Sequence, residues 1–162
     1  MAERSLVLAS GVLALVGGLI GLAVGGASLY VTSLGLAYFN ETLHRVLSAY
    51  PFVAVNITPQ AVTSMYSMMR ALGVVLTSTG LVGLAVSVIV ITIVRPAISR
   101  GELTAAASHC AALGVLLVVL GLISIYDFVQ LVLFAVAGAL LLVERGRLRR
   151  EAALGLPVNP TA

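Results

Sequence analysis

Apolar residues run through this chain in long uninterrupted stretches, not in the short alternating groups typical of strands. No Asp, Glu, Lys or Arg occurs between Arg4 and Glu41, and three later stretches are equally free of charge. A helix needs about 17 to 25 apolar residues to cross ~30 Å of hydrocarbon. The pattern therefore predicts four transmembrane helices, over residues 5–39, 71–94, 103–125 and 128–143.

The loops between these spans carry their own signals. Thr58 and Pro59 predict an N-cap and first helical position, and no breaker follows before Val94, so the second helix is expected to be overlong, like the first. Pro96 is interpreted as its stop signal. Asp127 and Gln130 have capping-box spacing, which predicts a tight hairpin between the last two spans.

Residues 40–70, between the first two spans, are too apolar for a simple loop. The stretch "ETLHRVLSAYPF" predicts an amphipathic helix ending at Pro51. We expect this helix and the overlong ends of the first two spans to form a small apolar outer module. Two N-x-[ST] triplets, at Asn40 and Asn56, are possible glycosylation sites within it.

Composition supports a membrane protein: 60% of the residues are hydrophobic and 9% are charged, against about 25% charged in soluble domains. We predict an all-α four-helix transmembrane bundle, with residues 1–150 as one domain and residues 151–162 as a disordered cytoplasmic tail.

The first apolar run also resembles a signal peptide that would be cleaved near Gly25–Ser28. Because the run continues to Phe39, we interpret it as a span.

Arginine placement predicts the orientation, since basic residues in short loops stay on the cytoplasmic side. One side of the predicted bundle carries Arg4, Arg95, Arg100, Arg145, Arg147, Arg149 and Arg150, and the other carries Arg45 and Arg70. Both termini are therefore expected in the cytoplasm, with the chain in the cell membrane. Anionic lipid headgroups are expected near four of these arginines, Arg145, Arg147, Arg149 and Arg150. Because the arginines at the span ends account for the net charge of +3, we expect no nucleic-acid partner.

Small residues recur on one side of the first span when it is projected at about 100° per residue. This small-residue face comprises Ser10, Ala14, Gly17, Gly21, Gly25, Ser28, Thr32 and Gly35. In lipid, small residues let helices approach closely and pack, so we expect the face to contact another helix, of the same chain or of another subunit. If the small-residue face packs against the other spans of the same chain, the overlong helix ends and the outer module are the surface expected to contact another subunit.

Candidate chemistry is sparse. His109 is the one ionisable residue well inside a predicted span, and it is interpreted either as a packing residue or as a proton or ligand group. Met65, Met68, Met69 and His44 could hold copper, but such methionines also act as flexible filler. Cys110, the single cysteine, is interpreted as a packing residue.

No nucleophile with a matching acid and base, and no phosphate-binding glycine loop, stands out in the sequence. We therefore expect no enzyme and no cofactor. The function we expect is a non-catalytic membrane subunit that assembles through the small-residue face into a homo- or hetero-oligomer. The alternative is a small oligomeric transporter or channel in which His109 handles a proton or ligand.

Overall fold

The computed structural model describes residues 3–49 and 58–154, and within these ranges the chain is helical, with turns and no strand. The elements are α1 (Glu3–Ser33), α2 (Leu36–Ala49), α3 (Pro59–Ile89), a π-helical segment η1 (Val90–Val94), α4 (Arg95–Ser99), α5 (Leu103–Ile123) and α6 (Phe128–Leu154). Four of the described helices are long and apolar enough to cross a membrane: Leu6–Ser33, Pro59–Ser99, Leu103–Ile123 and Phe128–Leu154. The predicted number of spans is confirmed at this level.

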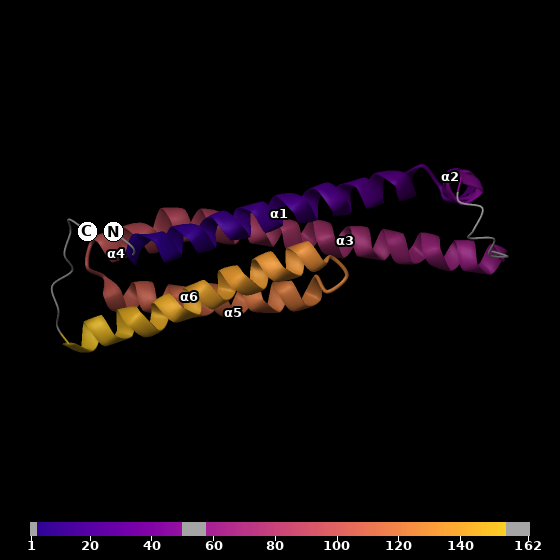
Figure 1. Ribbon diagram of the computed structural model, residues 1–162. Helices are drawn as coiled ribbons and strands as arrows, with labels where there is room; N and C mark the ends of the chain where they lie inside the picture. Colours follow the sequence, from indigo (N-terminus) through magenta and orange to yellow (C-terminus); the bar gives the residue numbers. More distant parts are fainter. Residues whose placement is uncertain (1–2, 50–57, 155–162) are drawn as a thin grey trace.

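The long helices pack as two antiparallel pairs. α1 lies along α3, α5 lies along α6, and α6 joins the pairs by packing on α1 (Figure 1). The start of α1, the α4–α5 connection and the end of α6 lie together at one end of the molecule, which we call the basic end after Arg95, Arg100, Arg145 and Arg149 (Figure 1). The four long helices run alternately in opposite directions, so the start of the first, the connection between the second and third, and the end of the fourth all lie at the same end.

The first helix ends earlier than the sequence predicted. We expected it to continue to Phe39, but α1 ends at Ser33 and α2 begins at Leu36. Gly35, between them, has a φ of +93°, a backbone conformation that residues with a β-carbon rarely adopt. This glycine therefore turns the chain where apolar composition alone indicated one continuous helix.

Pro96 does not stop the helix, contrary to the prediction. A proline lacks the N–H that an α-helix needs and crowds the carbonyl one turn earlier. The chain responds with the wider turn η1, in which the Arg95 N–H donates to the Val90 carbonyl, and helical structure then continues to Ser99. Such a π-turn is a recognised way to absorb a helix irregularity.

The last helix also differs in extent. We expected its apolar span to end at Val143, and α6 continues as a helix to Leu154. Residues 151–154 of the predicted disordered tail are thus helical, and residues 155–162 lie outside the described part. Leu148 is buried, so the bundle still holds α6 beyond the predicted end of its span.

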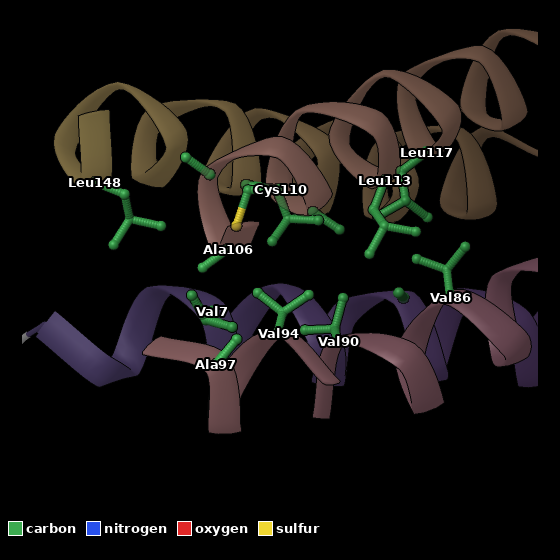
Figure 2. Close-up of a cluster of buried hydrophobic side chains, with 14 of the residues drawn as sticks. Val7, Val86, Val90, Val94, Ala97, Ala106, Cys110, Leu113, Leu117 and Leu148 are labelled. Atoms are coloured by element: carbon green, nitrogen blue, oxygen red, sulfur yellow. The ribbon is translucent and has the colours of Figure 1, made fainter. Parts of the chain in front are cut away.

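The apolar core runs along the part of the bundle that contains all four long helices, from Val7 and Leu148 to Leu120 and Phe134, and a close-up shows part of it (Figure 2). Val90 and Val94, from η1, face Cys110 and Leu117, from α5, across the interior, and each of these side chains is fully buried. Cys110 lies among hydrocarbon groups in this cluster, where a thiol packs as a small apolar side chain.

α1 and α3 continue well beyond the α5–α6 turn, whereas the α5–α6 pair stops there (Figure 1). The Ser124 hydroxyl hydrogen-bonds Thr79 of α3 at the level of the turn, and about 30 Å of α3 lies between Thr79 and Pro59 at 1.5 Å per residue. We call residues 22–49 and 59–75 the projecting part. Its α2 is fixed by an edge-to-face contact of Phe39 with Tyr66, at 5.7 Å between ring centroids.

Candidate functional site

Glycines on α1 admit side chains of α6 that a β-carbon would exclude. A Cβ added at Gly17 would lie 2.8 Å from the ring of Phe134, and one added at Gly21 would overlap the amide nitrogen of Gln130 and lie 2.8 Å from the Leu76 carbonyl oxygen. Phe134 and Gln130 are both fully buried. Each of these two glycines therefore makes room for one specific large side chain.

The contact between α1 and α3 is of another kind, because here backbone meets backbone. A Cβ at Gly25 would lie 2.6 Å from the Thr77 nitrogen and 2.9 Å from the Gly73 carbonyl oxygen. Further along the seam, a Cβ at Gly18 would lie 2.9 Å from the Gly80 carbonyl oxygen, and one at Gly80 would lie 2.8 Å from that of Gly18. Neither helix tolerates a larger residue here without separating from the other.

The rest of the small-residue face behaves similarly, with one exception. Ser10 donates to the Ala137 carbonyl of α6 at 2.8 Å, Ala14 is fully buried, and the Thr32 carbonyl accepts a 2.7 Å hydrogen bond from the Tyr66 hydroxyl of α3. Ser28 lies 3.1 Å from the position of a Cβ built on Gly73. Gly35 is the exception: it forms the α1–α2 turn and has nothing within 4 Å of an added Cβ.

Three polar side chains meet where the α5–α6 turn contacts α3, and we name Thr79, Ser124 and Gln130 the polar junction. The Thr79 hydroxyl oxygen accepts from Ser124 at 3.3 Å and from the Gln130 amide at 3.2 Å, and it donates to the Leu76 carbonyl at 3.1 Å. The Gln130 side-chain oxygen receives no hydrogen bond from the described residues. The junction fixes the height of the turn on α3, and its groups are neutral.

The sequence drew attention to Gln130 for another reason. The Asp127 carboxylate caps α6 as predicted, accepting from the backbone nitrogens of Val129 at 3.1 Å and Gln130 at 3.2 Å. The Gln130 side chain points to Thr79 and does not turn back to cap Asp127, whose own N–H donates to the Ser124 carbonyl. Thr79 and Ser124 were not anticipated, because hydroxyl residues in apolar helices usually bond their own backbone.

His109 is exposed on the outer surface of α5, near the basic end. Its Nδ1 lies 2.7 Å from the Ala105 carbonyl oxygen of its own helix. The polar junction, in contrast, is buried at the other end of α5. The structure therefore does not bring His109 together with the polar junction.

The outer module predicted from residues 40–70 contains a cleft of about 550 Å³ between α2 and the start of α3. Its lining is Leu36, Ala37, Asn40, His44, Pro59, Val62 and Thr63. Met65 and Met68 are exposed elsewhere on α3, Met69 is half-buried, and none of them lines this cleft. Asn40 lies within α2, and Asn56 lies outside the described residues.

No three His, Cys, Asp or Glu side chains among the described residues gather closely enough to hold a metal ion. Glu144, a functional candidate that the sequence reasoning missed, is buried on α6 at 3% exposure. Its spacing from Ala137 and Leu141, both buried, was the available signal, because residues three and seven apart share a helix face. Arg147, nearby, pairs with Glu151 at 2.9 Å.

No protein-family model matches the chain, and neither a curated protein nor a solved structure is found to be similar to it. Functional inference therefore rests on the geometry of the chain itself.

Proposed function

We propose that this chain is a non-catalytic integral membrane subunit that assembles with other membrane protein subunits or with its own copies. In this proposal the four long helices cross a cell membrane, and the basic end lies in the cytoplasm because arginines flanking short loops are retained there. The start of α1 and the end of α6 lie at that end (Figure 1), so both termini are cytoplasmic. The projecting part then extends on the outer side.

The observation that carries the proposal is the apolar surface of the projecting part. Its exposed large apolar residues are Val24, Tyr30, Leu34, Leu36, Tyr38, Val46, Met65, Met68 and Val74. Apolar area removed from water stabilises a complex by about 25 cal/mol per Å², and large exposed apolar patches mark interaction surfaces. A second membrane protein subunit covering this surface explains why α1 and α3 are so much longer than the α5–α6 pair.

Contacts within the projecting part favour it as a preformed surface. The Tyr66 hydroxyl bonds α1 at Thr32, the Tyr66 ring contacts Phe39 of α2, and Thr58 caps α3 by accepting from the Ala61 nitrogen at 3.2 Å. A surface already held in place loses little conformational entropy when a partner binds. The projecting part thus meets a physical requirement of an assembly surface.

In this proposal the small-residue face packs inside the bundle and does not form the contact between subunits that we expected of it. Gly17, Gly21 and Gly25 contact α3 and α6 of their own chain, which supports a role in setting helix spacing inside the bundle. Contact with another subunit passes to the projecting part, the other alternative that the sequence left open.

The proposal includes the lipid bilayer as a partner at the basic end. Arg145, Arg149 and Arg150 extend from α6 as it continues past Val143, with Arg145 half-buried and the other two exposed. Each arginine near an anionic membrane surface contributes about 1 kcal/mol of attraction.

The test is native mass spectrometry after mild solubilisation, which compares the mass of the solubilised particle with the 16.6 kDa of one chain. We expect an assembly larger than one chain. Met68→Glu should release the subunit that covers the projecting part, because it places a charge on the exposed apolar surface, whereas Ser67→Glu, which adds the same charge at the neighbouring exposed position, should not. A chain that always has the mass of one copy and carries no other protein contradicts the proposal.

A further inference from the structure

The outward side of α5 near the basic end carries polar groups within an apolar span. His109 and Ser108 are both exposed, between the exposed small residues Ala105 and Ala112. His109 lies six residues after Leu103, the start of α5, which is about 9 Å along the helix. Further along the same side, the exposed residues are the large apolar side chains Leu116, Val119 and Ile123, as expected of a surface that faces lipid.

The hydrogen bond of His109 fixes which nitrogen needs a partner. The Ala105 carbonyl, 2.7 Å from Nδ1, can only accept, so Nδ1 carries the proton of the neutral ring. Nε2 is then an acceptor at the outer end of the ring, directed away from the helix. Hydrocarbon offers no donor, and polar groups in a membrane span are costly unless another polar group meets them.

We infer that a second copy of this chain packs against this side of α5, with His109 Nε2 accepting from Ser108 of the partner copy. The inference adds to the proposed assembly a second contact, separate from the projecting part, and it rests on that proposal. Two copies inserted in the same orientation are related by a twofold axis along the membrane normal, so identical residues lie at identical depth. Ser108 adjoins His109 and therefore offers its hydroxyl at the depth where Nε2 needs a donor.

The contact is reciprocal, so one dimer contains two such hydrogen bonds. The Ser108 hydroxyl donates to the Ala105 carbonyl at 2.7 Å, an acceptor that already serves His109 Nδ1. Rotation of the hydroxyl towards the partner therefore leaves that carbonyl satisfied. Ala105 and Ala112 have only methyl side chains, which permits the two α5 helices to approach closely enough for these bonds.

Cysteine cross-linking tests the geometry, since Cys110 is the single cysteine of the chain and is buried. In a Cys110→Ala background, Ser108→Cys or Ala112→Cys should form a disulfide-linked dimer in lipid vesicles treated with a mild oxidant. Val143→Cys is the matched control, because Val143 is exposed on α6 near the same end of the bundle. The control should stay at the mass of one chain.

The hydrogen bond itself is tested by the dimer dissociation constant in vesicles, measured by energy transfer at several protein-to-lipid ratios. His109→Ala and Ser108→Ala should each weaken the dimer roughly tenfold, because each removes both symmetry-related bonds. The double variant should be no weaker than either single variant. Effects that multiply in the double variant overturn the hydrogen bond between the two residues.

The outcomes separate this inference from the proposed function. A wild-type chain that assembles but gives no cross-link at Ser108→Cys or Ala112→Cys, or one equal to that of Val143→Cys, overturns the α5 contact alone. A wild-type chain that assembles only with a different protein has the same consequence. A wild-type chain that never assembles overturns the proposed function, and the inference with it.

Discussion

Replacing Gly25 by alanine should separate α1 from α3, whereas the same replacement at the next residue should not. Gly25 faces α3 so closely that an added Cβ would lie 2.6 Å from the Thr77 nitrogen and 2.9 Å from the Gly73 carbonyl oxygen. At Gly26 an added Cβ has nothing within 4 Å. The two positions share one helix and nearly the same depth, so they form a matched pair.

The expected magnitude follows from this geometry. Alanine favours a helix over glycine by about 1 kcal/mol in water, and this contribution cancels when Gly25→Ala is compared with Gly26→Ala. What remains is the cost of moving two backbones apart by several tenths of an ångström. The nearest atom, the Thr77 hydroxyl oxygen at 2.5 Å, belongs to a side chain that can rotate, but the Thr77 nitrogen and the Gly73 carbonyl oxygen are backbone atoms. A gap of 0.5–1 Å loses a quarter to a half of each dispersion contact along the seam, and overpacking typically costs about 1–3 kcal/mol.

The assay is the free energy of unfolding in mixed micelles of a mild detergent and dodecyl sulfate, with the folded fraction read by pulse proteolysis. Gly25→Ala should be less stable than Gly26→Ala by about 1–3 kcal/mol. Gly80→Ala, whose Cβ would lie 2.8 Å from the Gly18 carbonyl oxygen, should fall in the same range. A difference below about 0.5 kcal/mol between the Gly25 and Gly26 variants would refute backbone contact between α1 and α3.

Three further substitutions test other contacts by the same measurement. Thr79→Val leaves the donors of the polar junction without their acceptor and should cost about 1–3 kcal/mol, whereas Thr92→Val should change little, because the exposed Thr92 hydroxyl bonds only its own helix. Phe134→Ala should cost about 3–5 kcal/mol, since the ring is fully buried, and Phe128→Ala, at a 73% exposed ring, should be nearly neutral. Tyr66→Phe removes one hydrogen bond to α1 and keeps the ring contact with Phe39, so it should cost about 0.5–1.5 kcal/mol and leave amide exchange in α2 unchanged; faster exchange there would contradict the ring contact as the one that fixes α2.

The helices were predictable because apolar length is a strong signal, and their ends were not, because single residues decide them. Gly35 ends α1 through a positive φ, which no hydrophobic pattern contains. Pro96 should end a helix on propensity alone, yet η1 carries the chain through it, since the flanking Val90, Val94 and Ala97 are buried. Burial of these neighbours outweighs a local irregularity.

The buried polar groups were less accessible to sequence reasoning. A hydroxyl residue such as Thr79 satisfies its donor on its own helix and so gives no sign of an interhelical role. Gln130 was recognised as part of a helix start, and the cap by Asp127 explains its position along the chain. Its neighbour across the bundle depends on the register between α3 and α6, which no local pattern specifies.

The glycines of α1 look alike in the sequence, but each has different neighbours in the structure. Helical periodicity places Gly17, Gly21 and Gly25 on one side, and from the sequence they are interchangeable contacts of one face. In the structure Gly17 admits the ring of Phe134, Gly21 admits an amide of the polar junction and also lies against the backbone of α3, and Gly25 lies against the backbone of α3. A ring can shift, whereas a buried amide shifts only by losing its hydrogen bond and a helix backbone shifts only with its whole helix. The same added methyl group should therefore be tolerated better at Gly17 than at Gly21 or Gly25.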